Sequence, residues 1–148
     1  MAIRKIDISR EEFDRINEVE NFLYNYKAIN LAIENLKMEL KSLDETTIGS
    51  IEYKDSIGKT NKFNSSVENI LTRKGLLRLR IEHMETKITQ IDRALGILLE
   101  IEKAVIKSFY IEDMCYFQFC SDINVSERTC QRIKRRALNK IIISVYGI

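Results

Sequence analysis

The residues best suited to chemistry in this sequence are six cationic side chains near its C-terminus. Between residues 126 and 140 they are accompanied by a single acid, Glu127. The six are Arg128, Arg132, Lys134, Arg135, Arg136 and Lys140. The chain as a whole carries a net charge of only +2, and residues 1–45 hold ten acids against seven bases. This local concentration of arginine and lysine on a nearly neutral chain indicates a surface that binds nucleic acid.

The same segment has the spacing of an amphipathic helix that begins at Ser126 and continues to about Leu138. Serine is a favoured N-cap because its side-chain oxygen accepts a hydrogen bond from a free backbone N–H. At helical spacing one face is apolar and should contact the core: Val125, Cys130, Ile133, Ala137 and Leu138. The opposite face is polar: Glu127, Arg128, Gln131, Arg132 and Arg135.

These outward residue types are the ones that read base edges in the major groove of DNA. Arginine donates two hydrogen bonds to guanine, glutamine pairs with adenine, and glutamate accepts from the cytosine amino group. We expect Lys134, Arg136 and Lys140 to contact phosphates. The alternative is a basic helix that is merely solvated. The predicted DNA-binding set is Ser126, Glu127, Arg128, Thr129, Gln131, Arg132, Lys134, Arg135, Arg136 and Lys140.

Two shorter helices are expected to support this basic helix. Residues 100–110 place four apolar side chains on one face, namely Ile101, Val105, Ile106 and Phe109. Asp113 should break that helix, a second should cover 114–121, and residues 122–125 should form a tight turn. Helix, short helix, turn and capped basic helix is the order of a helix-turn-helix, so we predict such a domain over residues 99–148.

Residues 1–98 predict long helices, because the chain lacks proline and has only five glycines. One helix over about 9–44 should begin at Ser9, with Glu12 completing a capping box. Its apolar seam is Val19, Phe22, Tyr26, Ile29, Ile33, Leu36, Leu40 and Leu43. The fold class is therefore all-α, with a coiled-coil-like helical hairpin ahead of the helix-turn-helix.

A second helix over about 66–98 should begin at the capping-box pattern of residues 65–68. Its seam is Ile70, Leu77, Ile81, Met84, Ile88, Ile91, Leu95 and Leu98, with Lys74 at one seam position. Residues 45–65 are expected to be a connector, with an extended segment or hairpin at Ile51 and Tyr53 as one option. The two seams can pair within the chain, or between chains as a homodimer.

Several function classes are disfavoured by the residues themselves. No apolar run reaches the roughly 20 residues of a membrane span and the N-terminus lacks a signal-peptide core, so we expect a cytoplasmic protein. Cys115, Cys120 and Cys130 lack metal-ligand spacing, and reduced thiols are expected. His83 has no nucleophile or carboxylate pair near it in the sequence. We therefore predict no enzyme activity, no metal and no cofactor.

Three segments resemble a known family of regulators. These are residues 102–112, residues 124–138 and the stretch 62–68. The first two resemble the −35-reading domain of sigma factors. With the third, they are more closely similar to the ArpU and RinA type of phage late-gene transcriptional regulators, over roughly residues 62–140. The resemblance implies activation of packaging, morphogenesis or lysis genes in a bacterial host, with Glu127, Arg128, Gln131 and Arg132 at base-reading positions.

Residues 114–120 depart from that family pattern, because they are aromatic where the family has small or polar residues. They either fill a larger core or cover a partner such as RNA polymerase. Two alternative functions also remain open. A DNA-packaging recognition subunit of the small-terminase kind should form a ring of about eight to ten copies. A helical protein-binding adaptor should fail to bind DNA even at low salt.

Overall fold

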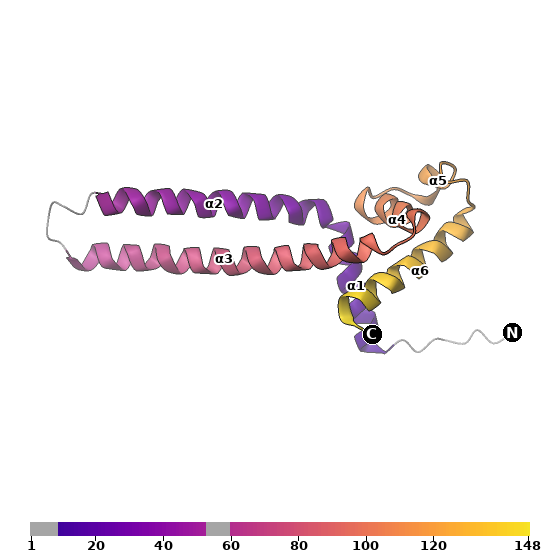
Figure 1. The fold of residues 1–148 in the computed structure, drawn as a ribbon, viewed down its shortest axis with the longest axis horizontal. Helices are drawn as coiled ribbons and strands as arrows, with labels where there is room; N and C mark the ends of the chain where they lie inside the picture. Colours follow the sequence, from indigo (N-terminus) through magenta and orange to yellow (C-terminus); the bar gives the residue numbers. More distant parts are fainter. Residues whose placement is uncertain (1–8, 53–59) are drawn as a thin grey trace. The chain divides into compact units, whose positions relative to one another are not determined.

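Helix accounts for the regular structure of residues 9–52 and 60–148, which are the residues that the computed structural model describes. In chain order the elements are α1 (Arg10–Tyr24), α2 (Tyr26–Glu52), α3 (Thr60–Gly96), α4 (Glu100–Ile106), the π-helical turn η2 (Lys107–Ile111), α5 (Tyr116–Phe119) and α6 (Glu127–Tyr146) (Figure 1). The predicted all-α class is confirmed. Among the described residues, no helix combines the length and the apolar character that crossing a membrane requires.

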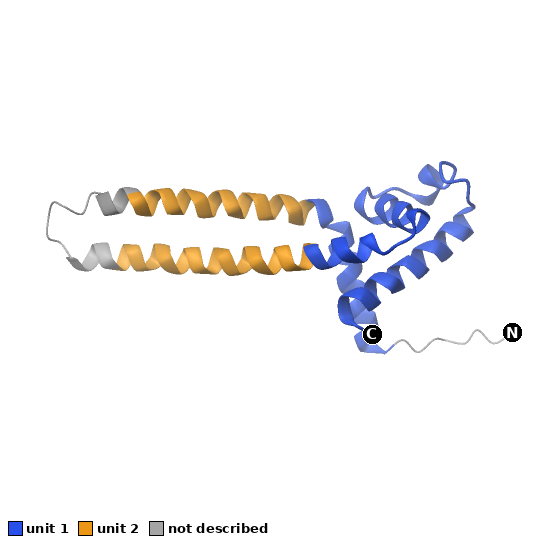
Figure 2. Ribbon diagram, viewed as in Figure 1, with its two compact units in different colours: residues 1–27, 89–148 blue, residues 28–88 orange. Residues whose placement is uncertain are grey.

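The chain forms two compact units, shown in different colours in Figure 2. One comprises residues 1–27 and 89–148, and the other comprises residues 28–88. This division differs from the predicted boundary at residue 98. The reason is that α1 packs against α6 and η2, so the N-terminal helix belongs to the same unit as the C-terminal one.

Helix α1 begins as the sequence predicts and ends much earlier. Ser9 and Glu12 form the expected capping box, with the Glu12 N–H donating to Ser9 Oγ at 3.3 Å. The single helix predicted over 9–44 is wrong, because α1 ends at Tyr24. The side chain and backbone N–H of Asn25 both donate to the Asn21 carbonyl oxygen, at 2.8 and 3.0 Å. Such side-chain to backbone bonding competes with helix continuation, and α2 starts afresh one residue later.

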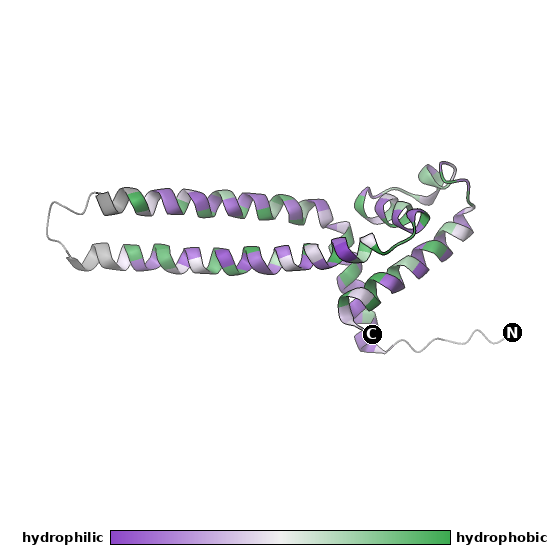
Figure 3. Ribbon diagram, in the orientation of Figure 1, coloured by the Kyte–Doolittle hydropathy of each residue, from purple (hydrophilic) through white to green (hydrophobic). Residues whose placement is uncertain are grey.

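In the unit of residues 28–88, α2 and α3 run antiparallel and side by side (Figure 1). Hydrophobic and hydrophilic residues alternate along both helices (Figure 3). Ion pairs join the two helices between Lys37 and Glu85 and between Arg73 and Glu39. The seam position of Lys74 is buried, and its ammonium lies 2.9 Å from an Asp44 carboxylate oxygen. The two seams of this unit are thus paired within one chain.

The predicted connector over residues 45–65 is wrong at both ends. Helix α2 continues to Glu52, so Ile51 is helical rather than extended, and α3 already begins at Thr60. Residues 65–68 therefore lie inside α3 and do not cap it. The expected hairpin position Tyr53 lies outside the described residues. Propensity alone misplaced these helix ends, since hydroxyl residues and isolated glycines are tolerated inside a longer helix.

The other unit has two apolar clusters. The larger joins α1, the end of α3, α4, η2 and α6, and consists of Val19, Leu23, Ile91, Ala94, Leu95, Leu98, Ile106, Tyr110, Ala137, Leu138 and Ile141. The smaller joins α4 and α6 to α5 and the residues beside it, and consists of Val105, Phe119, Cys120, Cys130 and Ile133. Tyr110 is fully buried in the larger cluster, and its hydroxyl donates to Glu20 at 2.7 Å. Together these clusters set the position of α6.

Candidate nucleic-acid interface

Helix α6 begins at the predicted cap and is longer than predicted. The Thr129 N–H donates to Ser126 Oγ at 3.2 Å, and the hydroxyls of Ser126 and Thr129 lie 2.9 Å apart. The turn before it contains Asn124 in the left-handed conformation, with φ +54°. The helix continues past Leu138 to Tyr146 because its apolar stripe continues, and it stops at Gly147, with φ +76°. A left-handed glycine is a common helix terminator.

The buried face of α6 agrees with the predicted one. Cys130, Ile133, Ala137 and Leu138 are buried, and Val125 is partly buried against the smaller cluster. Ile141 extends the same face and is fully buried. This burial fixes which side of α6 is left for solvent. Both predicted supporting helices are present: the one over residues 100–110 is divided into α4 and the π-helical turn η2, and the one over 114–121 is reduced to α5.

The exposed face of α6 presents the residues predicted to read bases. Glu127, Arg128, Gln131, Arg132 and Arg135 are all exposed, as is Thr129. Within residues 9–48 and 65–148, Arg128, Arg132 and Arg135 make no ion pair. These guanidinium groups are therefore available to an external anion.

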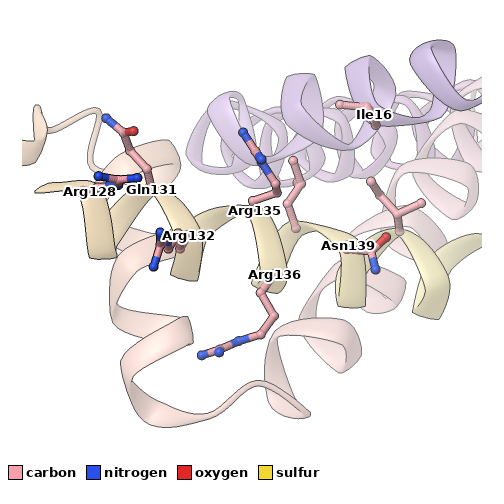
Figure 4. Close-up of a pocket in the computed structure, with 9 residues that line it drawn as sticks. Ile16, Arg128, Gln131, Arg132, Arg135, Arg136 and Asn139 are labelled. Atoms are coloured by element: carbon pink, nitrogen blue, oxygen red, sulfur yellow. The ribbon is translucent and has the colours of Figure 1, made fainter. Parts of the chain in front are cut away.

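A groove of about 640 Å³ follows this face. Helix α1 contributes one residue to its lining, Ile16, and the other lining residues come from α6 (Figure 4). The lining of α6 is Arg128, Gln131, Arg132, Arg135, Arg136, Leu138, Asn139 and Ile142. Sequence reasoning missed Ile16 and Asn139, because the groove exists only where α1 packs beside α6. Asn139 lies four residues after Arg135 on the same stripe, so helical spacing alone could have included it.

Two of the predicted phosphate contacts are instead ion-paired inside the unit. Glu102 of α4 is fully buried, and its carboxylate accepts hydrogen bonds from Arg136 Nε at 2.8 Å and Lys140 Nζ at 2.9 Å. Burial raises the pKa of Glu102, but hydrogen bonds from Lys140, the Leu99 backbone N–H and Arg136 outweigh that effect and lower it. Figure 4 shows Arg136 directed away from Arg135. The sequence predicted Arg136 and Lys140 on the DNA, and the structure places them against α4.

Lys134 also contacts the protein rather than standing free. Its ammonium lies 4.1 Å from the ring centroid of Phe109, with the Tyr116 and Tyr110 rings at 5.6 and 5.7 Å. A cation held over aromatic faces is stabilised by their ring quadrupoles. The aromatic residues Tyr116 and Phe119 thus fill a core around α6, which is one of the two options left open for residues 114–120. Phe117 is exposed and takes no part in that core.

Glu102 is the positioning residue that sequence reasoning overlooked. It occupies the same helical face as Val105, Ile106 and Phe109, where an acid without a partner is costly. Its position on an apolar face could have identified Glu102 from the sequence, because a buried carboxylate requires a cation as its partner. The cations come from residues 34 and 38 positions away in sequence, which no local pattern reveals.

One known protein family matches most of the chain. The profile of a family described as "Protein of unknown function (DUF722)" matches residues 13–142. The chain belongs to the DUF722 family. The match begins in α1 and ends in α6, so it includes both the paired helices and the arginine-lined face. No curated protein and no solved structure matches the chain.

Proposed function

We propose that this DUF722 protein is a sequence-specific regulator of transcription that binds double-stranded DNA through α6. The observation that carries the proposal is the segregation of α6 into a buried apolar face and an exposed face with three arginines that make no ion pair within residues 9–48 and 65–148. Arg128, Arg132 and Arg135 are exposed on that face, while Cys130, Ile133 and Ala137 are buried opposite. A helix held by its apolar side with arginine and glutamine on the other is suited to the major groove.

The arrangement before α6 supports the same proposal. A short helix, a turn through Asn124 and the serine-capped α6 follow one another in the order of a helix-turn-helix. The N-terminal half of α6 carries Arg128, Gln131 and Arg132, and base contacts in this motif come from the N-terminal residues of the second helix. Arg136 and Lys140 have a different task in this proposal, because their pairing with Glu102 orients α6.

The proposed cellular role rests on the resemblance to phage late-gene regulators. In that role the protein acts in the cytoplasm of a bacterial host and activates packaging, morphogenesis or lysis genes near a late promoter. RNA polymerase is the partner of such an activator, and exposed Phe117 offers an apolar side chain for a protein contact.

The test is to select duplexes bound by the full-length chain from a random pool, then measure their affinity by fluorescence anisotropy. Each bidentate arginine to guanine contact contributes about 1–3 kcal/mol of discrimination, or roughly 5- to 150-fold in Kd. We expect Arg128→Ala and Arg132→Ala each to weaken binding of the selected duplex by that order and to relax specificity. Arg80→Ala is the matched control, because Arg80 is an exposed arginine of α3.

The salt dependence of binding distinguishes side chains that bind bases from those that bind phosphates. Removing a side chain that binds a phosphate reduces the slope of log K against log salt by about 1, whereas removing one that binds a base leaves that slope nearly unchanged. If the double variant of Arg128 and Arg132 bound the selected duplex as tightly as the Arg80→Ala control, α6 would not be the reading helix. If the native chain bound no duplex at low salt, the proposal would fail altogether.

A further inference from the structure

Two buried thiols lie against each other beneath the start of α6. Cys120 follows α5 and Cys130 lies in the first turn of α6, and their Sγ atoms are 2.8 Å apart. Cys120 is 5% exposed and Cys130 is fully buried. The third cysteine, Cys115, is exposed at the N-cap of α5. The pair is therefore separate both from Cys115 and from the arginine-lined face of α6.

The geometry around the pair suits a covalent link. The S–S distance of a disulfide is about 2.05 Å, so the two sulfur atoms need to approach by less than about 1 Å. The chain between them consists of the turn before α6 and the first residues of α6, residues 121–129. The Val125 N–H donates to the Cys120 carbonyl oxygen at 3.2 Å across the turn, and the Cys130 N–H donates to the Ser126 carbonyl oxygen at 2.9 Å. Both ends of the link are thus already held beside each other by the backbone.

We propose that Cys120 and Cys130 form a redox modification site, at which a peroxide closes a disulfide that ties the turn to α6. The thiolate sulfur of Cys120 attacks a peroxide oxygen, the O–O bond breaks, and the departing hydroxide takes up a proton to give water and Cys120 sulfenic acid. The Cys130 sulfur then attacks the Cys120 sulfur and displaces a second hydroxide. Overall, two thiols and one hydrogen peroxide give one disulfide and two waters.

The order of the two steps follows from the environments of the two sulfurs. Cys120 is 5% exposed whereas Cys130 is fully buried, and the residues that follow Cys120, Ser121 and Asp122, are exposed. A small oxidant is therefore expected to reach Cys120 first. Burial and the hydrogen bond with Cys120 raise the pKa of Cys130 to about 12, so its thiolate is scarce at neutral pH. The thiolate is the nucleophile in both steps, so Cys130 reacts poorly with a dilute oxidant, whereas in the second step its partner sulfur is held 2.8 Å away and this proximity offsets the scarce thiolate.

The experiment uses the full-length Cys115→Ser variant, which removes the exposed thiol. The protein is treated with hydrogen peroxide, quenched, alkylated with iodoacetamide in denaturant and digested with trypsin. Cleavage after Lys107, Arg128 and Arg132 places Cys120 on the peptide 108–128 and Cys130 on the peptide 129–132. We expect more than half of the chains to yield these two peptides joined, and dithiothreitol to separate them. Trapping of Cys115 sulfenic acid in the unmodified sequence confirms that the oxidant was active.

The melting temperature of the oxidised variant provides the second measurement. Closing a loop of about ten residues should raise it by roughly 10–20 °C, because the link restricts the unfolded chain. Joined peptides in fewer than a tenth of the chains, or peroxide products that are mainly linked between chains, would overturn the proposal. So would a lower melting temperature after oxidation, because the bond would then strain the native turn. None of these readouts depends on DNA binding.

Discussion

Glu102→Gln should destabilise the unit that contains α6, even though the substitution is nearly isosteric. The carboxylate of Glu102 is fully buried and accepts hydrogen bonds from Arg136, from Lys140 and from the Leu99 backbone N–H at 3.1 Å. A neutral amide keeps one acceptor oxygen and turns the other position into a donor that faces two cations. The substitution therefore weakens the two charge-assisted bonds, while the shape of the core is retained.

The size of the effect follows from the partners that are left behind. Removing one partner of a buried ion pair costs about 3–5 kcal/mol when the remaining charge is buried too. The side chains of Arg136 and Lys140 are 57% and 38% exposed, so both cations can regain water. We therefore expect a smaller decrease of about 2 kcal/mol in the free energy of unfolding, close to that of one charge-assisted hydrogen bond. For a unit of this size that is a drop of about 10 °C in Tm.

Near-UV circular dichroism of tyrosine is the appropriate assay. The chain has no tryptophan, and five of its six tyrosines lie in the unit of residues 1–27 and 89–148, which makes the signal specific for that unit. Glu100→Gln is the matched control, because the Glu100 side chain is 92% exposed and its ion pair is a local one, with Lys103 three residues further along α4. The control should change stability by less than about 0.5 kcal/mol, as exposed pairs do.

The pH dependence provides an independent check. The pKa of Glu102 is lower in the folded than in the unfolded state, so its contribution to stability is present above the normal glutamate pKa. That contribution disappears as the pH falls through the lower folded pKa. The native sequence should therefore lose more stability than Glu102→Gln on going from pH 6 to pH 3, about the range set by glutamate titration. Equal melting temperatures and parallel pH profiles would refute the assignment of Glu102 as the anchor of α6.

Four further substitutions test other parts of the structure. Lys134→Ala should remove the cation from the Phe109 ring and lower the free energy of unfolding by about 1 kcal/mol in thermal melts. The slope of log K against log salt for DNA binding should stay unchanged. A reduced slope would show that Lys134 binds a phosphate instead. Lys74→Leu should be neutral or stabilising in far-UV melts, because it replaces a buried ammonium by an apolar seam residue while the half-exposed Asp44 carboxylate keeps Arg78 at 3.7 Å. Asp44→Asn should destabilise, because it leaves the buried Lys74 ammonium without its carboxylate. Ser126→Ala should lower the free energy of unfolding by about 1 kcal/mol in thermal melts, because the Thr129 backbone N–H loses its N-cap acceptor. An unchanged melting temperature would show that this hydrogen bond does not stabilise α6.

The sequence alone determined those features that depend on neighbours within a few turns of helix. The all-α class followed from the absence of proline and from the seams. The caps at Ser9 and Ser126 and the division of α6 into two faces followed from local spacing, because residues three and four apart share a helical face whatever the rest of the chain does. The base-reading role of the exposed face remains a proposal.

The tertiary structure decided what depends on distant partners. The break at Asn25, the extension of α2 and α3, and the packing of α1 on α6 were not predictable from periodicity, because packing overrides propensity at helix ends. The same holds for the cations of α6. In the sequence, nothing distinguishes Lys134, Arg136 and Lys140 from Arg128 and Arg132. In the structure, the buried Glu102 carboxylate binds Arg136 and Lys140, and the Phe109 ring contacts Lys134. These three cations therefore hold α6 in place, whereas Arg128 and Arg132 make no ion pair within residues 9–48 and 65–148.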